Sequence, residues 1–163
     1  MPELQRLAAH HAAALLRFER DNREWFARSV PDRGDAYFAD FDARHAGLLA
    51  EQEAGACHFH VLVDADGAVL GRFNLVDVVD GEAELGYRVA ERAAGRGVAT
   101  DGVRRVAALA RAAYGLCRLT ARTTLDNAGS LAVLRRTSFT PVGEVSLDGR
   151  PGLRFVRELT ADD

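Results

Sequence analysis

The stretch Arg92-Ala93-Ala94-Gly95-Arg96-Gly97-Val98-Ala99-Thr100 lies between a run typical of a β-strand, Glu84 to Val89, and a long amphipathic helical pattern. Two glycines there open the helix, and a backbone without side chains can approach an anion closely. The first N–H groups of a helix have no partner within it, so they are free to bind phosphate. A phosphorylated cofactor is therefore the first hypothesis for this chain.

The segments after the turn predict a ligand-binding α/β unit. Apolar residues recur at helical spacing, at Val103, Val106, Ala110 and Ala113. Gly115 stands where a helix C-cap belongs, and Arg118 to Thr123 is typical of a strand. A strand, a crossover helix and a second strand place the glycine turn at the carboxyl end of a strand, where open α/β sheets bind ligands.

An antiparallel meander is expected ahead of the turn. Its strands lie near 59–63, 69–78 and 82–89, and the turns between them are Asp66-Gly67 and Asp80-Gly81. Alternation predicts that the residues of each strand face two sides in turn.

Helical patterns surround this meander. Two precede it, from Ala8 to Phe26 and from Asp35 to Glu53. A helix from Ala128 to Thr137 follows the βαβ-like unit, and two strands flank the turn Leu147-Asp148-Gly149-Arg150. No repeat or linker divides the chain, so residues 1–163 are expected to form one α/β (α+β) domain with a mixed sheet flanked by helices.

The composition limits the classes of partner. The net charge of −3 gives no broad basic face for nucleic acid. No run approaches the roughly 20 apolar residues that span a bilayer, and a signal-peptide pattern is missing, so we expect a cytoplasmic protein without a membrane partner. The sequence has no lysine, a bias typical of a GC-rich bacterial genome. Walker-type P-loops, Schiff-base enzymes and pyridoxal enzymes each need a lysine, so these classes are excluded.

A metal site is not expected. Cys57 and Cys117 form no C-x-x-C pair, and His58 and His60 stand beside Cys57 without a fourth ligand at usable spacing.

A dinucleotide fingerprint does not fit the glycine turn. The pattern G-x-G-x-x-G would need a third glycine where this chain has Thr100. That fingerprint also belongs to the first βα unit of a parallel fold, whereas a meander precedes the turn here.

The segment Arg92-x-x-Gly95-x-Gly97 resembles the R/Q-x-x-G-x-G/A acyl-coenzyme A signature of the GNAT acetyltransferase superfamily. Its flanks, Glu84-Leu85-Gly86-Tyr87 and Gly97-Val98-Ala99-Thr100, resemble E-I/L-G-Y and G-x-A-T of the RimJ/RimL-like branch of ribosomal-protein N-terminal acetyltransferases. Further likenesses are Asn127-x-x-Ser130 with Val133, Leu134 and Phe139, and the segment from Glu19 to Phe26. Two positions depart from the branch, Ser138 where glycine is common and Arg135 where an acidic residue is usual.

The resemblance implies a GNAT fold, with a mixed, mostly antiparallel sheet and a splayed central pair of parallel strands. It implies acetyl-CoA as co-substrate. The coenzyme pyrophosphate would rest on the N–H groups between Arg92 and Thr100, and the pantetheine arm would pair with the strand that ends at Val89. The implied cofactor-binding residues are Tyr87, Val89, Arg92, Gly95, Arg96, Gly97, Ala99, Thr100 and Asn127.

Ser130 and Glu84 are the candidate catalytic residues. Many superfamily members protonate the leaving thiolate with a tyrosine one helical turn after the position of Ser130, but Leu134 stands there, and in the resembled branch the serine is the usual proposal. Glu84 is the first candidate for the base that accepts the amine proton, and Glu82 is the second. Structural roles stay open: a salt bridge to Arg72 or Arg88 for Glu84, a bond to its own backbone for Ser130, and an N-cap for Asn127.

The expected activity is transfer of an acetyl group from acetyl-CoA to a primary amine, by direct attack in a ternary complex. The resemblance favours a peptide or protein N-terminus as acceptor, and a small-molecule amine stays open. Trp25, Phe26, Tyr37 and Phe38 either line the acceptor pocket or belong to the core. The alternative is a non-catalytic module that binds or senses acyl-CoA. The oligomeric state, a homodimer included, is left open.

Overall fold

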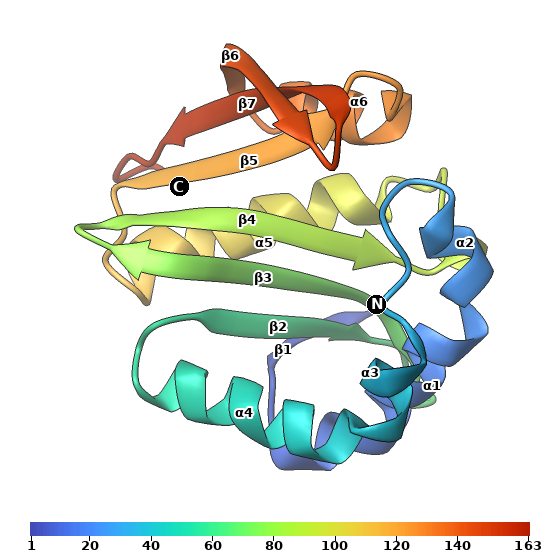
Figure 1. Cartoon of the computed structure of the whole chain (residues 1–163). Helices are drawn as coiled ribbons and strands as arrows, with labels where there is room; N and C mark the ends of the chain where they lie inside the picture. Colours follow the sequence, from blue (N-terminus) through green and yellow to red (C-terminus); the bar gives the residue numbers. More distant parts are fainter.

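Seven strands form one mixed sheet in this computed structural model, which describes all residues 1–163. In spatial order the strands are β1 (Glu3–Arg6), β2 (His58–Val63), β3 (Val69–Val79), β4 (Glu82–Val89), β5 (Arg118–Thr124), β7 (Arg150–Glu158) and β6 (Thr140–Leu147). All neighbours are antiparallel except β4 and β5 (Figure 1). The expected mixed, mostly antiparallel sheet is confirmed.

Helices cover both faces of this sheet. One group comprises η1 (Ala9–His11), α1 (Ala12–Asp21), α2 (Arg23–Ala27), α3 (Asp35–Ala39) and α4 (Phe41–Glu53). The other comprises η2 (Glu91–Ala93), α5 (Val98–Ala112) and α6 (Ala128–Arg136). In Figure 1, α5 lies behind the sheet.

Alternation along the strands divides the core into two clusters. In β2, Phe59, Val61 and Val63 pack with the first helical group, whereas Leu62 packs with α5 and α6. Phe73 and Phe155, both fully buried, belong to the α5 and α6 side. Each face of the sheet is therefore apolar and needs a helical cover.

The long helical patterns near the N-terminus are interrupted. The predicted helix from Ala8 to Phe26 consists of η1, α1 and α2, and Asn22 leaves the helical conformation between the last two. Likewise, Asp40 separates α3 from α4 within the range predicted as one helix. Strand β1 was not predicted, because it is a four-residue edge strand with only one clearly apolar residue.

The central feature is the separation of β4 from β5. They pair only at Glu82 with Arg118, Ala83 with Leu119 and Glu84 with Thr120. Beyond these residues each strand stays bonded to its outer neighbour, since Val89 still pairs with Gly71 of β3 and Thr124 with Gly152 of β7. The strands therefore diverge toward their carboxyl ends (Figure 1), and the expected splayed parallel pair is confirmed. No helix of the chain has both the length and the apolar character needed to cross a membrane.

Candidate acyl-transfer site

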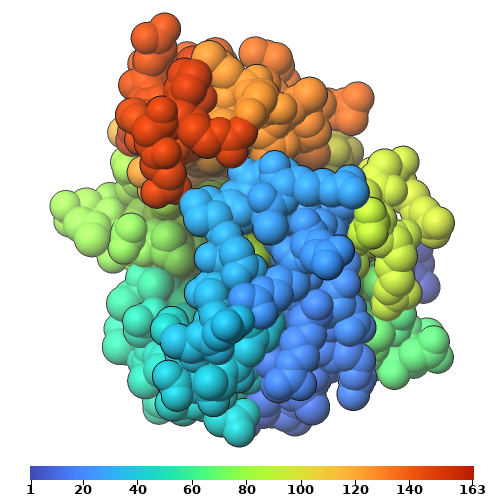
Figure 2. Space-filling view, turned by 45° about the vertical axis from the view of Figure 1, so that its right-hand side comes forward, coloured from blue at the N-terminus to red at the C-terminus, as the bar shows by residue number.

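A cavity of about 900 Å³ occupies the gap between the diverging strands. Its walls come from β4, β5, the turn before α5 with the first turn of that helix, α6, α2 with the loop after it, and the turn between β6 and β7. Figure 2 shows the N-terminal helical segment, in blue, directly below the C-terminal hairpin, in red, on this side of the molecule. Segments distant in sequence thus close one site.

The glycine turn forms one end of the cavity. Gly95 and Gly97 have φ values of 70° and 75°, which L side chains rarely adopt. Gly97 is the N-cap of α5 and offers no side-chain cap, and a Cβ built on either glycine would meet no protein atom within 4 Å. The first N–H groups of α5 therefore lack a side-chain partner next to open space, which fits a bound phosphate.

The residues between Arg92 and Thr100, predicted to hold the pyrophosphate, fall into two sets. Ala94, Gly95, Gly97, Val98, Ala99 and Thr100 line the cavity. Arg92 and Arg96 are exposed and do not line it. The Arg92 guanidinium instead pairs with Asp64, with Nη2 3.3 Å from Oδ2. The backbone on both sides of Arg96 therefore lines the cavity, whereas Arg92 and Arg96 do not.

The free edge of β4 faces the gap. The Ala90 N–H donates to Leu70 O of β3 at 2.8 Å. Alternate residues of an antiparallel strand bond to the same neighbour, so the N–H and C=O of Val89 point to the opposite edge, toward β5. Consistently, Trp25 Nε1 donates to Val89 O at 3.2 Å from outside the sheet. The Val89 N–H therefore points toward the gap between β4 and β5, and Val89 lines the cavity.

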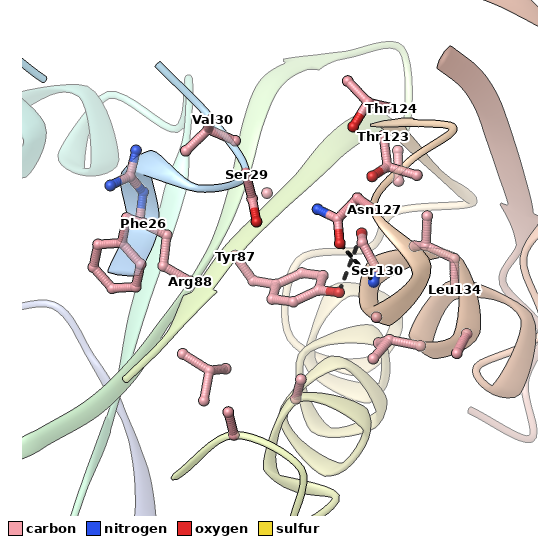
Figure 3. A pocket seen from close by; sticks show the side chains of 18 of the residues that line it. Phe26, Ser29, Val30, Tyr87, Arg88, Thr123, Thr124, Asn127, Ser130 and Leu134 are labelled. Carbon is pink, nitrogen blue, oxygen red and sulfur yellow. Dashed lines mark hydrogen bonds between the residues drawn. The ribbon is translucent and has the colours of Figure 1, made fainter. Parts of the chain in front are cut away.

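Three polar side chains meet where β4 faces α6 (Figure 3). The Ser130 N–H donates to Asn127 Oδ1 at 3.1 Å, so Asn127 is the N-cap of α6. The Tyr87 hydroxyl donates to Ser130 Oγ at 3.4 Å. Burial raises the pKa of Tyr87, although its bond to Ser130 opposes this, so the hydroxyl keeps its proton at neutral pH. Two hydroxyls therefore lie together on the cavity wall.

Glu84 is placed apart from these hydroxyls. It lies on the other face of β4 from Tyr87 and does not line the cavity. Arg122 of β5 holds both of its carboxylate oxygens, with Nε at 2.8 Å and Nη2 at 3.1 Å. This partner is neither Arg72 nor Arg88, the two partners considered from the sequence. Glu82 lies further from the cavity and pairs with Arg118 and Arg154 on the exposed surface.

A buried carboxylate next to the cavity escaped the sequence analysis. Glu19 of α1 has a side chain only 1% exposed, and three arginines surround it. Arg72 Nη1 lies 2.8 Å from Oε2, while Arg33 Nε and Arg88 Nη1 lie 3.0 and 3.3 Å from Oε1. Burial alone would raise the pKa of Glu19, but the charges of Arg72, Arg33 and Arg88 hold it below its ordinary value. One available signal was Arg72 itself, a charge in the buried first half of β3.

The four aromatic residues considered for the acceptor pocket also fall into two groups. Trp25 and Phe26 line the cavity, and the Arg88 guanidinium lies 4.9 Å from the Phe26 ring centre. Tyr37 is buried in the core cluster of α1 to α4, with Phe38 packed against that cluster. The last two are core residues.

The histidines near Cys57 have structural partners. His58 stacks on Tyr114 at 3.7 Å between ring centres, and His60 Nε2 lies 2.6 Å from the Tyr114 hydroxyl. No group of three or more histidine, cysteine or acidic side chains in the chain could hold a metal ion.

Known proteins share this architecture. The family model of the acetyltransferase (GNAT) domain matches residues 3–140. The uncharacterized N-acetyltransferase p20 of Bacillus licheniformis is 29% identical over 93 residues, which are 56% of this chain and 52% of that protein. The match therefore spans about half the length of that curated relative.

Solved structures are similar over nearly the whole chain. Ribosomal-protein-S5-alanine acetyltransferase of Vibrio fischeri gives a TM-score of 0.91 at 18% identity, covering 98% of this chain and 94% of that one. RimJ of Mycobacterium smegmatis, in complex with CoA-disulfide, gives 0.85 at 24% identity, covering 95% and 80%. At such identities these structures establish a common fold.

Proposed function

The chain belongs to the family of GNAT acetyltransferase domains, and from this premise we propose that it transfers an acetyl group from acetyl-CoA to a primary amine. One observation carries the proposal. A single cavity joins the uncapped start of α5 to the free edge of β4 and to the Tyr87 and Ser130 hydroxyls. Acetyl-CoA has a pyrophosphate, an amide-bearing arm and a thioester in the same order.

The residues present fit the coenzyme. N–H groups from Ala94 to Thr100 would hold the pyrophosphate, because a helix start with positive-φ glycines is an anion site. The free edge of β4, at Tyr87 and Val89, would pair with the pantetheine amides as an added strand. Asn127 Oδ1 is used by its cap, so its amide nitrogen is the group left to contact the arm.

Val89 N–H is the proposed donor to the thioester carbonyl. It points into the gap, and a donor aimed at a developing oxyanion can lower the barrier by about 3 kcal/mol. Bound acetyl-CoA supplies an activated acyl group, so the chain needs no covalent nucleophile. A neutral amine held next to the thioester can attack directly.

Ser130 and Tyr87 are the proposed proton donors to the departing thiolate. Both hydroxyls line the cavity, and the Tyr87 proton is directed at Ser130 Oγ. A proton passed from Ser130 to sulfur can be replaced from Tyr87. Their pairing gives the site a tyrosine hydroxyl although Leu134 occupies the position where related enzymes carry one.

Glu84 is the proposed acceptor of the amine proton. Both its oxygens are held by Arg122, so accepting a proton requires the carboxylate to leave that ion pair. Arg122 is a residue of the cavity wall, and its side chain would then be free to turn toward the acceptor.

A peptide or protein N-terminus is the proposed acceptor class. The similar structure from Vibrio fischeri is named for acetylation of an alanine of a ribosomal protein. The cavity opens beside the loop after α2 and the turn between β6 and β7, which gives an extended chain two flanking surfaces. Small amines are the second class to test.

A thiol-release assay tests the activity. The purified chain, acetyl-CoA and a panel of peptide and small-molecule amines are mixed, and free coenzyme A is measured. We expect amine-dependent release with at least one acceptor. Binding of coenzyme A without release by any amine would favour the non-catalytic module instead.

A further inference from the structure

Four of the five charged residues that line the cavity are arginines. The charged residues that line it are Arg88, Arg122, Arg136, Arg150 and Asp148. Arg122 is neutralised by Glu84, and Arg150 by Asp126. Arg136 is exposed and is the last residue of α6, whereas Ser130 lies in the first turn of that helix. Arg88 remains the positive group beside α2, where its guanidinium lies against Phe26.

Arg88 is not neutralised by its own partner. Glu19 is one carboxylate shared among Arg33, Arg72 and Arg88, so this cluster carries three positive charges against one negative charge. Arg72 Nε, buried in the same cluster, has no hydrogen-bond partner. Burial and the charges of Arg33 and Arg72 lower the pKa of Arg88 to about 10, although Glu19 opposes them. The cluster therefore has an excess of cations for which burial is costly.

Arg88 places part of this excess positive charge next to the proposed reaction centre. Arg88 directly precedes Val89, the proposed thioester donor, and its side chain leaves β4 on the face opposite Tyr87. Figure 3 shows Arg88 with Phe26 on one side of the cavity and Ser130 with Asn127 on the other. Its side chain is 20% exposed, and the residue forms part of the cavity wall. An acceptor amine in front of the thioester would have Arg88 next to it.

We propose that Arg88 binds a carboxylate of the acceptor, so that the preferred substrates are amines carrying an acidic group a short distance from the nitrogen. This inference rests on the proposed acetyl transfer and specifies its acceptor. A guanidinium binds a carboxylate through paired, charge-assisted bonds, and such a bond here would reduce the excess positive charge of the cluster. A polycationic amine would be repelled by the same group. The carboxylate could be an acidic side chain near a peptide N-terminus or the α-carboxylate of a free amino acid.

Matched acceptors distinguish these sources. One arm uses tripeptide amides that begin with alanine and carry glutamate, glutamine or lysine at the second position. The other arm compares free L-alanine with L-alaninamide. For wild-type protein we expect kcat/KM to be about 10- to 100-fold higher for the carboxylate member of at least one arm, the range typical of a hydrogen bond to a charged group.

Variants assign the preference to Arg88. Arg88→Gln should reduce it to less than about threefold with little change in the KM for acetyl-CoA, and Arg88→Lys should keep part of it because the charge remains. Arg118→Gln removes an exposed arginine that pairs with Glu158 outside the cavity, and it should keep the full preference. A thermal melt of each variant shows that it folds.

Calorimetry gives a second readout that does not need turnover. In the presence of coenzyme A, the glutamate tripeptide amide or L-alanine should bind to wild-type protein more tightly than its neutral counterpart, and to Arg88→Gln equally. Equal rates and equal binding for charged and neutral acceptors, or a preference for lysine, would overturn the inference while leaving acetyl transfer intact. An equal loss with all acceptors in Arg88→Gln would overturn it too. If no amine releases thiol, the proposed function fails, and the calorimetric comparison still decides on the carboxylate site.

Discussion

The Tyr87 hydroxyl of β4 donates a hydrogen bond to Ser130 Oγ of α6 at 3.4 Å, across the gap where β4 and β5 have parted. Ser130 is itself held by α6, because its N–H donates to the Asn127 cap. Leu134, one turn later, is 1% exposed and belongs to the core. The two hydroxyls therefore come from two elements whose relative position is fixed by the sheet. Under the proposed function, this pair would protonate the departing thiolate.

Removing either hydroxyl should slow turnover more than it weakens coenzyme binding. Ser130→Ala and Tyr87→Phe are each expected to lower kcat by at least about tenfold, since a positioned proton donor contributes 10²-fold or more. The double variant should lose little beyond the worse single one, because the two hydroxyls act in sequence. Steady-state kinetics and calorimetry with coenzyme A measure both quantities. Tyr114→Phe, which removes a hydroxyl bonded to His60, should leave kcat unchanged; an unaltered kcat in Ser130→Ala would return that residue to a structural role.

A charged side chain in the glycine turn should abolish coenzyme binding. Gly97→Glu places a carboxylate where the pyrophosphate is expected, at a position that already requires a φ of 75°. Gly67→Glu is the matched control, because Gly67 has a φ of 83°, equally open surroundings and no contact with the cavity. Calorimetry should detect binding in the control and none in Gly97→Glu. Equal affinity of the two variants for coenzyme A would mean that the glycine turn does not bind the pyrophosphate.

Two substitutions in the ion pair between Glu84 and Arg122 distinguish a catalytic role of the Glu84 carboxylate from a structural one. If Glu84 accepts the amine proton, Glu84→Gln should lower kcat/KM by at least about tenfold. Arg122→Gln frees the carboxylate and should lower kcat/KM by no more than about fivefold, because an exposed pair contributes at most about 1 kcal/mol. Both variants are measured with the same acceptor. Losses of the same size would mean that only the salt bridge matters.

Protonation of His60 should destabilise the fold in acid. Its side chain is 1% exposed, and burial lowers its pKa from 6.5 to about 4. Between these values the unfolded chain binds the proton and the folded chain does not, so the free energy of unfolding falls as pH decreases. The loss between pH 6.5 and pH 4 should approach about 3 kcal/mol for this group.

Denaturant titrations of wild type and His60→Gln at those two pH values isolate this contribution. The variant should show a smaller loss, and His10→Gln, which changes an exposed histidine, should behave as wild type. A loss in His60→Gln as large as in wild type would mean that other groups cause the acid sensitivity.

Local signals explain why the centre of the molecule could be predicted. The meander from β2 to β4 follows from alternating residues and two glycine turns, and α5 follows from its apolar spacing after Gly97. These features depend on neighbours in sequence. The same holds for the N-cap at Asn127, which lies three residues before its partner Ser130.

Long-range pairing explains what could not be predicted. Insertion of β7 between β5 and β6 depends on registers such as Arg118 with Glu158, 40 residues apart. Glu19 meets Arg72 and Arg88 only after α1 has packed on the sheet. The sequence shows that Glu84 can pair with an arginine, but it does not show which one. The partner depends on which strand lies beside β4.

Transfer of an isotope label tests directly whether the protein moves the acetyl group from acetyl-CoA to an amine. Acetyl-CoA with a deuterated acetyl group is incubated with the protein and an amine acceptor, and the acceptor is analysed by mass spectrometry. If the protein transfers the acetyl group, the label is found on the acceptor nitrogen with wild-type protein and is missing with Gly97→Glu. Coenzyme A bound to the wild-type protein, with the label retained on the thioester for every amine, would contradict it.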